Sequence, residues 1–271
     1  MRYQGERYIW EHEEPDRDTV REISRATGAV DVLSTVLASR GVASGEEAAA
    51  FLDPGAHRLP DPHLLPDADR AVDRVRRALL ARERIAVHGH DDADGVTATT
   101  VLTEALAQLG TAAVTYIPDR RTEGHGLNRA EIDRLRTEDV RLIVTVDSCV
   151  SDVAEIEYAR SLGIDVVVTD HHEIPPTLPP AAAIVNPKLE TGRYPYPLMA
   201  GAGVSLAFSR LLLDELGGTF PPLPAGAPWY GTGWTGEAFA VATIGTIADK
   251  VPLTGDNRAI VAEGLRRIAE A

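Results

Sequence analysis

Short apolar runs alternate with amphipathic segments through the middle of the chain. Five short runs rich in β-branched residues predict buried strands. They span residues 84–88, 112–117, 141–146, 164–169 and 182–185. Apolar residues at helical spacing between these runs predict helices near 95–109, 128–136 and 151–162. This alternation indicates an α/β fold, a parallel five-stranded sheet flanked by helices on both faces.

Both ends of the chain carry helical patterns without strands. Three- and four-residue apolar spacing predicts helices before and after the sheet. They are expected over 19–38 and 67–82, and near 203–216, 236–247 and 256–270. A Pro/Gly-rich loop at 217–236 interrupts the second group. We therefore divide the chain into a helical N-terminal region, 1–83, and a larger domain, 84–271, that ends in a helical subregion.

Carboxylates and histidines follow three of the predicted strands. The first strand leads into a segment that runs from His88 to Gly95, the third into Asp147, and the fourth into Asp170-His171-His172. The carboxyl ends of parallel strands meet at one edge of a sheet, where open α/β sheets bind ligands. One such Asp is equally well explained as a turn or helix-cap residue. Several carboxylates packed together would have to be protonated unless cations neutralise them.

The residue types and their spacing indicate two metal ions. Mixed Asp and His ligands suit Mn²⁺ or Mg²⁺ and, less well, Zn²⁺, while the single cysteine, Cys149, excludes a thiolate-rich zinc site. Asp92 and Asp94 are spaced to reach different ions, and Asp147 is a natural bridging carboxylate. His171 and His172 point to opposite sides, so one can bind metal while the other faces substrate. Such a set serves a two-metal clamp around a phosphate.

These motifs resemble those of the DHH phosphoesterase superfamily and, within it, the RecJ single-strand-specific exonucleases. Residues 88–95 are similar to the first motif, HGDYDADG. The second, third and naming motifs resemble residues 117–127, 145–147 and 169–172, and later signatures resemble 185–187, 200–204 and 244–258, in the same order. Residues 36–62 resemble the stretch before the catalytic core. The resemblance covers residues 8–270.

The chain departs from the resembled motifs at two places. His90 stands where RecJ proteins carry Asp, so both His88 and His90 are candidate ligands. Alternation along the strand does not separate them, because they have equal parity; the His-x3-Asp-x-Asp spacing of the wider superfamily favours His88. Ser148-Cys149 stands where RecJ proteins carry Cys-Gly, which indicates a different turn after Asp147.

The resemblance implies metal-dependent hydrolysis that removes nucleotides 5′→3′ from single-stranded DNA in repair and recombination. Two ions, Mn²⁺ or Mg²⁺, are implied. One would be held by His88 or His90, Asp92 and Asp147, and the other by Asp94, Asp147, His171 and Asp249. Arg120 and His172 would contact the scissile phosphate, Asp170 would orient a metal ligand, and Asn186 and Gly203 would shape the substrate pocket. Arg121 is expected at the surface, and His125 in packing or substrate contact.

The net charge argues against nucleic acid on composition alone. A charge of −14 and a pI of about 5.0 are the wrong sign for binding a polyanion through counterion release. Bound metals would neutralise part of this charge. The chain stops within a predicted helix, so we expect a catalytic fragment without the C-terminal domains that help relatives hold the strand. Trp229, Tyr230 and Trp234 could stack on bases, but a loop of this length more often packs on itself.

Two other functions stay open. A small-substrate DHH phosphoesterase, acting on oligoribonucleotides, cyclic dinucleotides or pyrophosphate, agrees with the negative charge. A degenerate DHH scaffold without activity is opposed by the presence of every ligand type. A single-strand-binding protein and a helicase are candidate partners. No apolar run approaches ~18 residues and no signal-peptide pattern is present, so we expect no membrane association and a cytoplasmic location.

Overall fold

The computed structural model describes residues 2–4, 7, 9–11, 14–217 and 234–270. Its contacts divide the chain into two compact units, Met1–His57 and Arg58–Ala271, which are described separately. Trp229 and Tyr230 lie outside the described residues, and so does the side chain of Trp234. Within the part of the chain that is described, no helix has the length and apolar content needed to span a bilayer.

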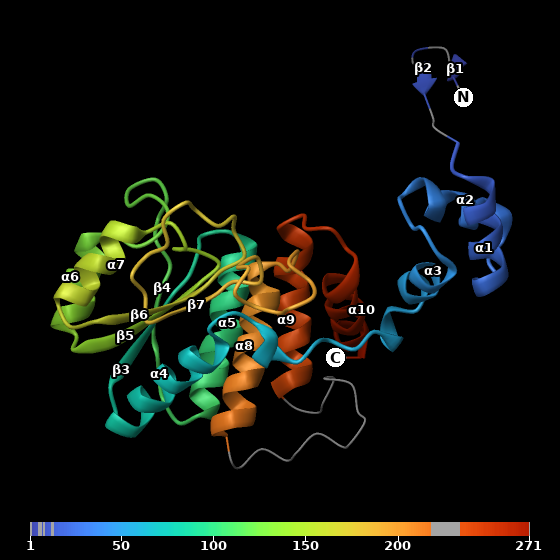
Figure 1. Cartoon of the computed structure of the whole chain (residues 1–271). Coiled ribbons are helices and arrows are strands. Elements are labelled where there is room, and N and C mark those ends of the chain that lie inside the picture. The colour runs from blue at the N-terminus through green and yellow to red at the C-terminus, as the bar shows by residue number, and fades with distance from the viewer. Residues whose placement is uncertain (1, 5–6, 8, 12–13, 218–233, 271) are drawn as a thin grey trace. The chain divides into compact units, whose positions relative to one another are not determined.

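The larger unit is built on the five-stranded parallel sheet that the sequence predicts (Figure 1). Its strands are β3 (Arg84–His88), β4 (Val114–Tyr116), β5 (Val140–Val146), β6 (Asp165–Thr169) and β7 (Ala183–Val185). The order across the sheet is β4-β3-β5-β6-β7, and every neighbouring pair is parallel. All five strands therefore end at the same edge of the sheet.

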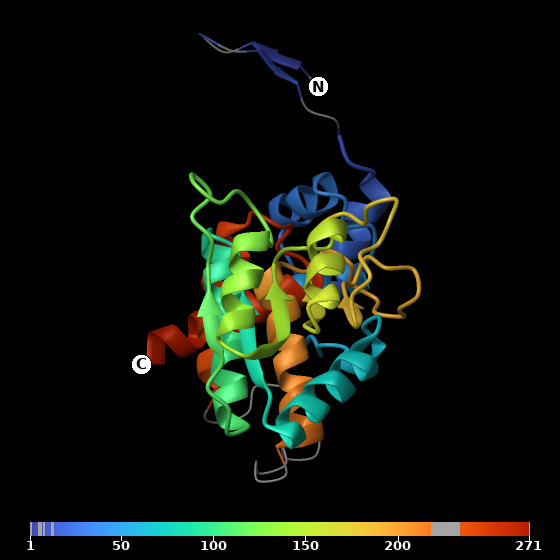
Figure 2. The same cartoon turned by 90° about the vertical axis from the view of Figure 1, so that its left-hand side faces the viewer.

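Helices cover both faces of the sheet, as expected (Figure 2). One face carries α6 (Arg129–Thr137) and α7 (Val153–Ser161); the other carries α4 (Ala68–Ala81), α5 (Ala93–Gln108) and α8 (Gly201–Leu216). Ile143 and Val144 are neighbours on β5, yet they are buried in different hydrophobic clusters, one on each face. This is why apolar residues follow one another without alternation in the middle of the central strands. Of the last helices, α9 (Trp234–Ala248) packs on α5 and α8, and α10 (Gly255–Glu270) packs mainly on α9.

The described residues of the smaller unit form a hairpin, three short α-helices and a 3₁₀ helix at Pro54–Ala56. Strands β1 (Arg2–Gln4) and β2 (Ile9–Glu11) pair antiparallel, which the sequence did not predict. The helices are α1 (Arg17–Thr27), α2 (Asp31–Ser39) and α3 (Gly45–Leu52). The helical pattern over 19–38 is broken at Gly28, whose φ of 69° ends α1 in a left-handed cap.

The division between the units falls after His57, earlier than the boundary after residue 83 that the helical pattern suggested. Helix α4 lies in the larger unit because its apolar side joins the core of the sheet through Val72 and Val75. The buried Arg74 adds an ion pair to Asp165 at the start of β6, 2.5 Å between Nε and Oδ2. A helical pattern alone contains no information about which core a helix joins.

Candidate metal centre

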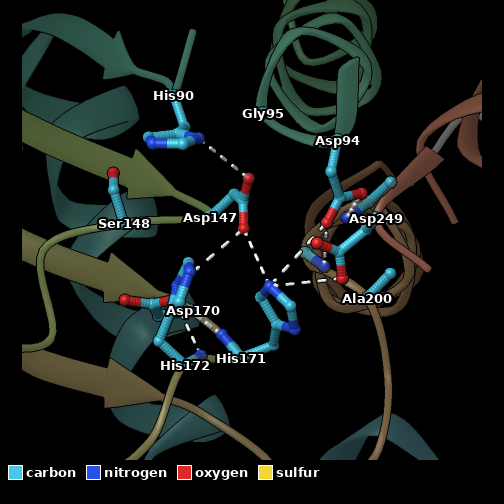
Figure 3. A network of polar contacts seen from close by, with 12 residues as sticks. His90, Asp94, Gly95, Asp147, Ser148, Asp170, His171, His172, Ala200 and Asp249 are labelled. Carbon is cyan, nitrogen blue, oxygen red and sulfur yellow. Dashed lines mark hydrogen bonds and ion pairs between the residues drawn. The ribbon is translucent and has the colours of Figure 1, made fainter. Parts of the chain in front are cut away.

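Side chains from separate segments of the larger unit meet at the carboxyl end of the sheet (Figure 3). They follow β3, β5, β6 and α9, the order in which the sequence places its carboxylates and histidines. Among the described residues, four sets of three side chains have their possible ligand atoms within 4.8 Å of one another, and two of these groups consist only of residues that were expected to hold metal. These groups are His90, Asp92 and Asp147, and Asp94, His171 and Asp249. The structure thus brings together most of the residues that were expected to hold metal.

Asp147 belongs to the first group and also lies beside His171 of the second. Its Oδ2 is 3.7 Å from His90 Nδ1, and its Oδ1 is 3.0 Å from His171 Nε2 (Figure 3). The side chain is 2% exposed. Its backbone has a φ of 57°, a left-handed conformation that Asp tolerates better than most residues. This position, at the end of the central strand, is the one expected of a bridging carboxylate.

Asp94 is buried against the first turn of α8. Its two oxygens accept hydrogen bonds from the backbone N–H groups of Gly201 and Ala202, at 2.7 and 2.9 Å. Burial and the neighbouring Asp147 nevertheless raise the pKa of Asp94 to about 7. Close packing is obtained with glycine: a Cβ added to Gly201 would lie 2.6 Å from Asp147 Oδ1, and one on Gly245 2.7 Å from Asp94 Oδ1. The two helices therefore approach the carboxylates by their backbones.

The raised pKa values of the cluster favour protons at positions where cations would fit. Burial raises the pKa of Asp147. Burial lowers the pKa of His171, but the carboxylates of Asp147, Asp94 and Asp249 outweigh it and raise that pKa to about 9. Three buried atoms, His90 Nδ1, Asp147 Oδ1 and His171 Nε2, make no hydrogen bond among the described residues, although each has an oppositely charged neighbour 3.0 Å away. Divalent cations would displace these protons and use these lone pairs, so the donor set fits the two expected ions.

His88 lies apart from both groups. Its ring is fully buried, and Nδ1 lies 2.8 Å from Oε1 of Glu131 on α6. It belongs to none of the candidate metal groups among the described residues, whereas His90 lies 3.0 Å from Asp92 Oδ2. The structure therefore places His90, and not the His88 that the superfamily spacing favours, beside the carboxylates. The sequence offered no sign of Glu131, which is an ordinary polar position of a helix.

Asp170 organises the loop after β6. Its Oδ1 accepts hydrogen bonds from the backbone N–H groups of His171 and His172 and lies 2.7 Å from Nδ1 of His172. Burial alone would raise the pKa of Asp170, but these bonds and His172 lower it. The side chain that Asp170 orients is thus His172, which also belongs to a group of possible metal ligands with Asp147 and His171. Asn186 donates from Nδ2 to the His172 carbonyl oxygen at 3.0 Å, so it supports this loop.

Two predicted substrate residues have other contacts in the structure. Arg120 pairs with Asp91 through Nε and Nη2, at 2.5 and 2.8 Å, and this bond lowers the pKa of Asp91. Gly203 faces the interior of the helical layer, where an added Cβ would meet Met199 and Ile260. Asp91 was not singled out from the sequence, although it stands between two candidate ligands.

A cavity of about 370 Å³ opens beside Asp147. Its wall includes the side chains of His90, His125 and His172 and the turn from Ser148 to Asp152. Cys149, in the position of the motif glycine, has a φ of 79°, a backbone conformation that favours glycine. The departure at Ser148-Cys149 therefore places a side chain in a left-handed turn beside the cavity.

The chain is similar to known exonucleases over most of its length. Residues 84–221 match the DHH family, N-terminal domain. The single-stranded-DNA-specific exonucleases RecJ of Bacillus subtilis (strain 168) and Escherichia coli (strain K12) are each 36% identical to it, over 96% and 88% of this chain. The crystal structure of RecJ in complex with Mn²⁺ from Thermus thermophilus matches with a TM-score of 0.71 and 33% identity, over 95% of this chain and 34% of that one. This chain spans 31% and 40% of the length of the two curated relatives.

Proposed function

This chain belongs to the DHH family, and on that premise we propose that it carries the catalytic centre of a two-metal-dependent exonuclease acting 5′→3′ on single-stranded DNA in repair and recombination. The observation that carries the proposal is the pair of ligand groups connected by Asp147, which belongs to the first group and lies 3.0 Å from His171 of the second. The likeness to RecJ exonucleases over 96% of the chain supports the choice of substrate.

The proposed ligand sets follow the two groups. His90, Asp92 and Asp147 would hold one ion, and Asp94, Asp147, His171 and Asp249 the other. We propose Mn²⁺ or Mg²⁺, in agreement with the Mn²⁺ bound by the structurally similar RecJ. Bound at these positions, the two ions would acidify a water molecule and neutralise charge on the phosphate.

His172 is the residue best placed to contact the phosphate. Asp170 holds its Nδ1, so the opposite nitrogen, Nε2, remains for substrate, and the side chain is 54% exposed. The hydrogen bond to Asp170 also raises the pKa of His172, which favours the imidazolium form. A cation here would bind the phosphate and can give a proton to the leaving oxygen. Arg120 would have to break its ion pair with Asp91 to reach a phosphate, so we assign it a smaller role in substrate binding.

A small-substrate phosphoesterase is the second candidate. The net charge of −14 disfavours a long polyanion, and a cavity of about 370 Å³ is near the lower end of the roughly 300–1,000 Å³ range of ligand pockets. The assembled ligand groups oppose the scaffold without activity. Interaction with a single-strand-binding protein or a helicase, and a cytoplasmic location, remain parts of the proposal.

The test offers the purified chain 5′- and 3′-labelled single strands, duplexes and cyclic dinucleotides with Mn²⁺. We expect release of a labelled mononucleotide from the 5′-labelled single strand and progressive shortening of the 3′-labelled one. Asp147→Asn should lower the rate at least about 100-fold, the scale of losing one preorganised transition-state contact. Asp73→Asn, at an exposed position of α4, is the matched control. Cleavage of cyclic dinucleotides alone would instead establish the second candidate.

A further inference from the structure

His90 and His125 of the cavity wall lie close to Asp91, and neither His125 nor Asp91 has a role in the proposed reaction. His90 Nε2 is 3.3 Å from His125 Nδ1 and 3.6 Å from Asp91 Oδ1. The two imidazole rings are stacked, with centroids 5.4 Å apart and an angle of 28° between their planes. Ligand atoms of all three residues lie within 4.8 Å of one another.

The spacing of the two nitrogens equals that of two ligands on one zinc ion. Nitrogens bound to Zn²⁺ at 2.0–2.1 Å lie about 3.3–3.4 Å apart on a tetrahedron. The oxygen of Asp91 is only a few tenths of an ångström farther from His90 than this edge requires. Two histidines and one carboxylate, with a fourth position left for water, form a common zinc ligand set. From these observations we propose that His90, His125 and Asp91 form an additional site for Zn²⁺, the rim site, outside the two-ion centre.

The new site and the two-ion centre share one imidazole ring. Toward the centre, His90 presents Nδ1, which lies 3.0 Å from Asp92 Oδ2 and 3.7 Å from Asp147 Oδ2. Toward the rim it presents Nε2. A neutral imidazole carries a proton on one nitrogen and a lone pair on the other, so it binds one metal at a time. When Zn²⁺ takes Nε2, the proton resides on Nδ1 and faces the carboxylates, as in the usual carboxylate–histidine–zinc arrangement.

Occupation of the rim site therefore removes a ligand from the two-ion centre. Without Zn²⁺, His90 can offer Nδ1 to an ion held with Asp92 and Asp147. With Zn²⁺ bound, that position keeps only its carboxylates. On the proposed function, Zn²⁺ at the rim is thus an inhibitor that acts through His90.

The charges around the rim site give it a moderate affinity for Zn²⁺. Arg120 binds both oxygens of Asp91, which fixes the carboxylate beside His90 and also places a positive charge near the ion. Asp92 and Asp147 lie on the other side of the His90 ring and oppose that charge. We expect the rim site to bind Zn²⁺ more weakly than the two-ion centre.

The test counts the zinc ions bound by the whole chain. The variant His125→Phe keeps an aromatic ring and lacks the ligand nitrogen. Equilibrium dialysis followed by elemental analysis should find one bound Zn²⁺ fewer in this variant than in the unchanged protein. The affinity of the rim site for Zn²⁺ should fall at least about 100-fold. His63→Phe, which removes a histidine paired with Asp69 away from the rim, should bind as many ions as the unchanged protein. Co²⁺ in place of Zn²⁺ should give visible absorption of tetrahedral type that His125→Phe diminishes. Equal zinc counts and equal Co²⁺ spectra in His125→Phe and the unchanged protein would refute the site.

The inhibitory consequence needs a second readout. With Mn²⁺ present, micromolar Zn²⁺ should inhibit cleavage by the unchanged protein and by His63→Phe more strongly than cleavage by His125→Phe. Inhibition of the same strength in all three would overturn the competition for His90, while the zinc count still decides the site. Absence of any cleavage with Mn²⁺ would count against the proposed function and leave the zinc count unaffected.

Discussion

Removing metal should make the stability of the fold fall as the pH rises. The pKa of His171 lies at about 9, above its ordinary value of 6.5, because Asp147, Asp94 and Asp249 surround it. A group with a raised pKa in the folded state contributes stability that is complete below pH 6.5 and is lost as the pH rises through about 9. Metal binding requires the neutral imidazole, so the bound ion replaces the contribution of the proton.

The expected loss of stability follows from the ordinary and the raised pKa of His171. At 1.36 kcal/mol per pH unit, the difference between 6.5 and about 9 corresponds to about 3 kcal/mol. For a unit of this length, 1 kcal/mol moves the melting temperature by roughly 2–4 °C. The metal-free protein should therefore lose roughly 6–12 °C between pH 6.5 and pH 9 through this side chain.

Differential scanning calorimetry in EDTA and in saturating Mn²⁺, at half-unit steps of pH, measures the effect. The gap between the two melting temperatures should widen from pH 6.5 to pH 9. His171→Asn in EDTA should lack this slope, and NMR titration of the imidazole ring reports its pKa directly. A gap that stays constant across this range, together with a normal His171 titration, would show that the cluster does not hold a proton in place of metal.

Three further predictions concern ligands, packing and substrate. His90→Ala should weaken Mn²⁺ binding in calorimetric titration more than His88→Ala does. His88→Ala should instead lower the free energy of unfolding by about 3–5 kcal/mol, because the partner carboxylate of Glu131 stays buried and unpaired. A larger loss of Mn²⁺ affinity in His88→Ala would restore His88 as the ligand. Gly201→Ala should weaken Mn²⁺ binding, because the added Cβ would displace Asp147. Gly203→Ala should not, because its Cβ would come no closer than 3.3 Å to the surrounding side chains, the nearest being Met199. Equal Mn²⁺ affinities of the two variants would refute this prediction. Binding of single strands should vary with salt at a slope of about −0.7 for each of roughly one to three phosphates, and a slope steeper than about −3 would show a broad basic contact that the charge of −14 does not suggest.

Much of the fold was encoded locally. The apolar runs marked β3, β5 and β6 because strands buried on both faces carry consecutive apolar residues in their middle. Since parallel strands end together, the acidic residues that follow these runs had to meet, and Asp147 at the tip of the central strand had to lie among them. The kind of chemistry at the candidate centre could therefore be predicted from the sequence.

Which atoms meet was decided by contacts between distant segments. His88 and His90 have equal parity, but the strand ends at His88. The ring of His88 hydrogen bonds to Glu131, 43 residues away. Asp94 is held by the first turn of α8, 107 residues away, and only there does the need for glycine at Gly201 become visible. Sequence periodicity reports the environment along one element, whereas these pairings depend on how elements pack against each other. The sequence thus determined the sheet and the kind of chemistry, and the tertiary structure alone determined which histidine faces the carboxylates.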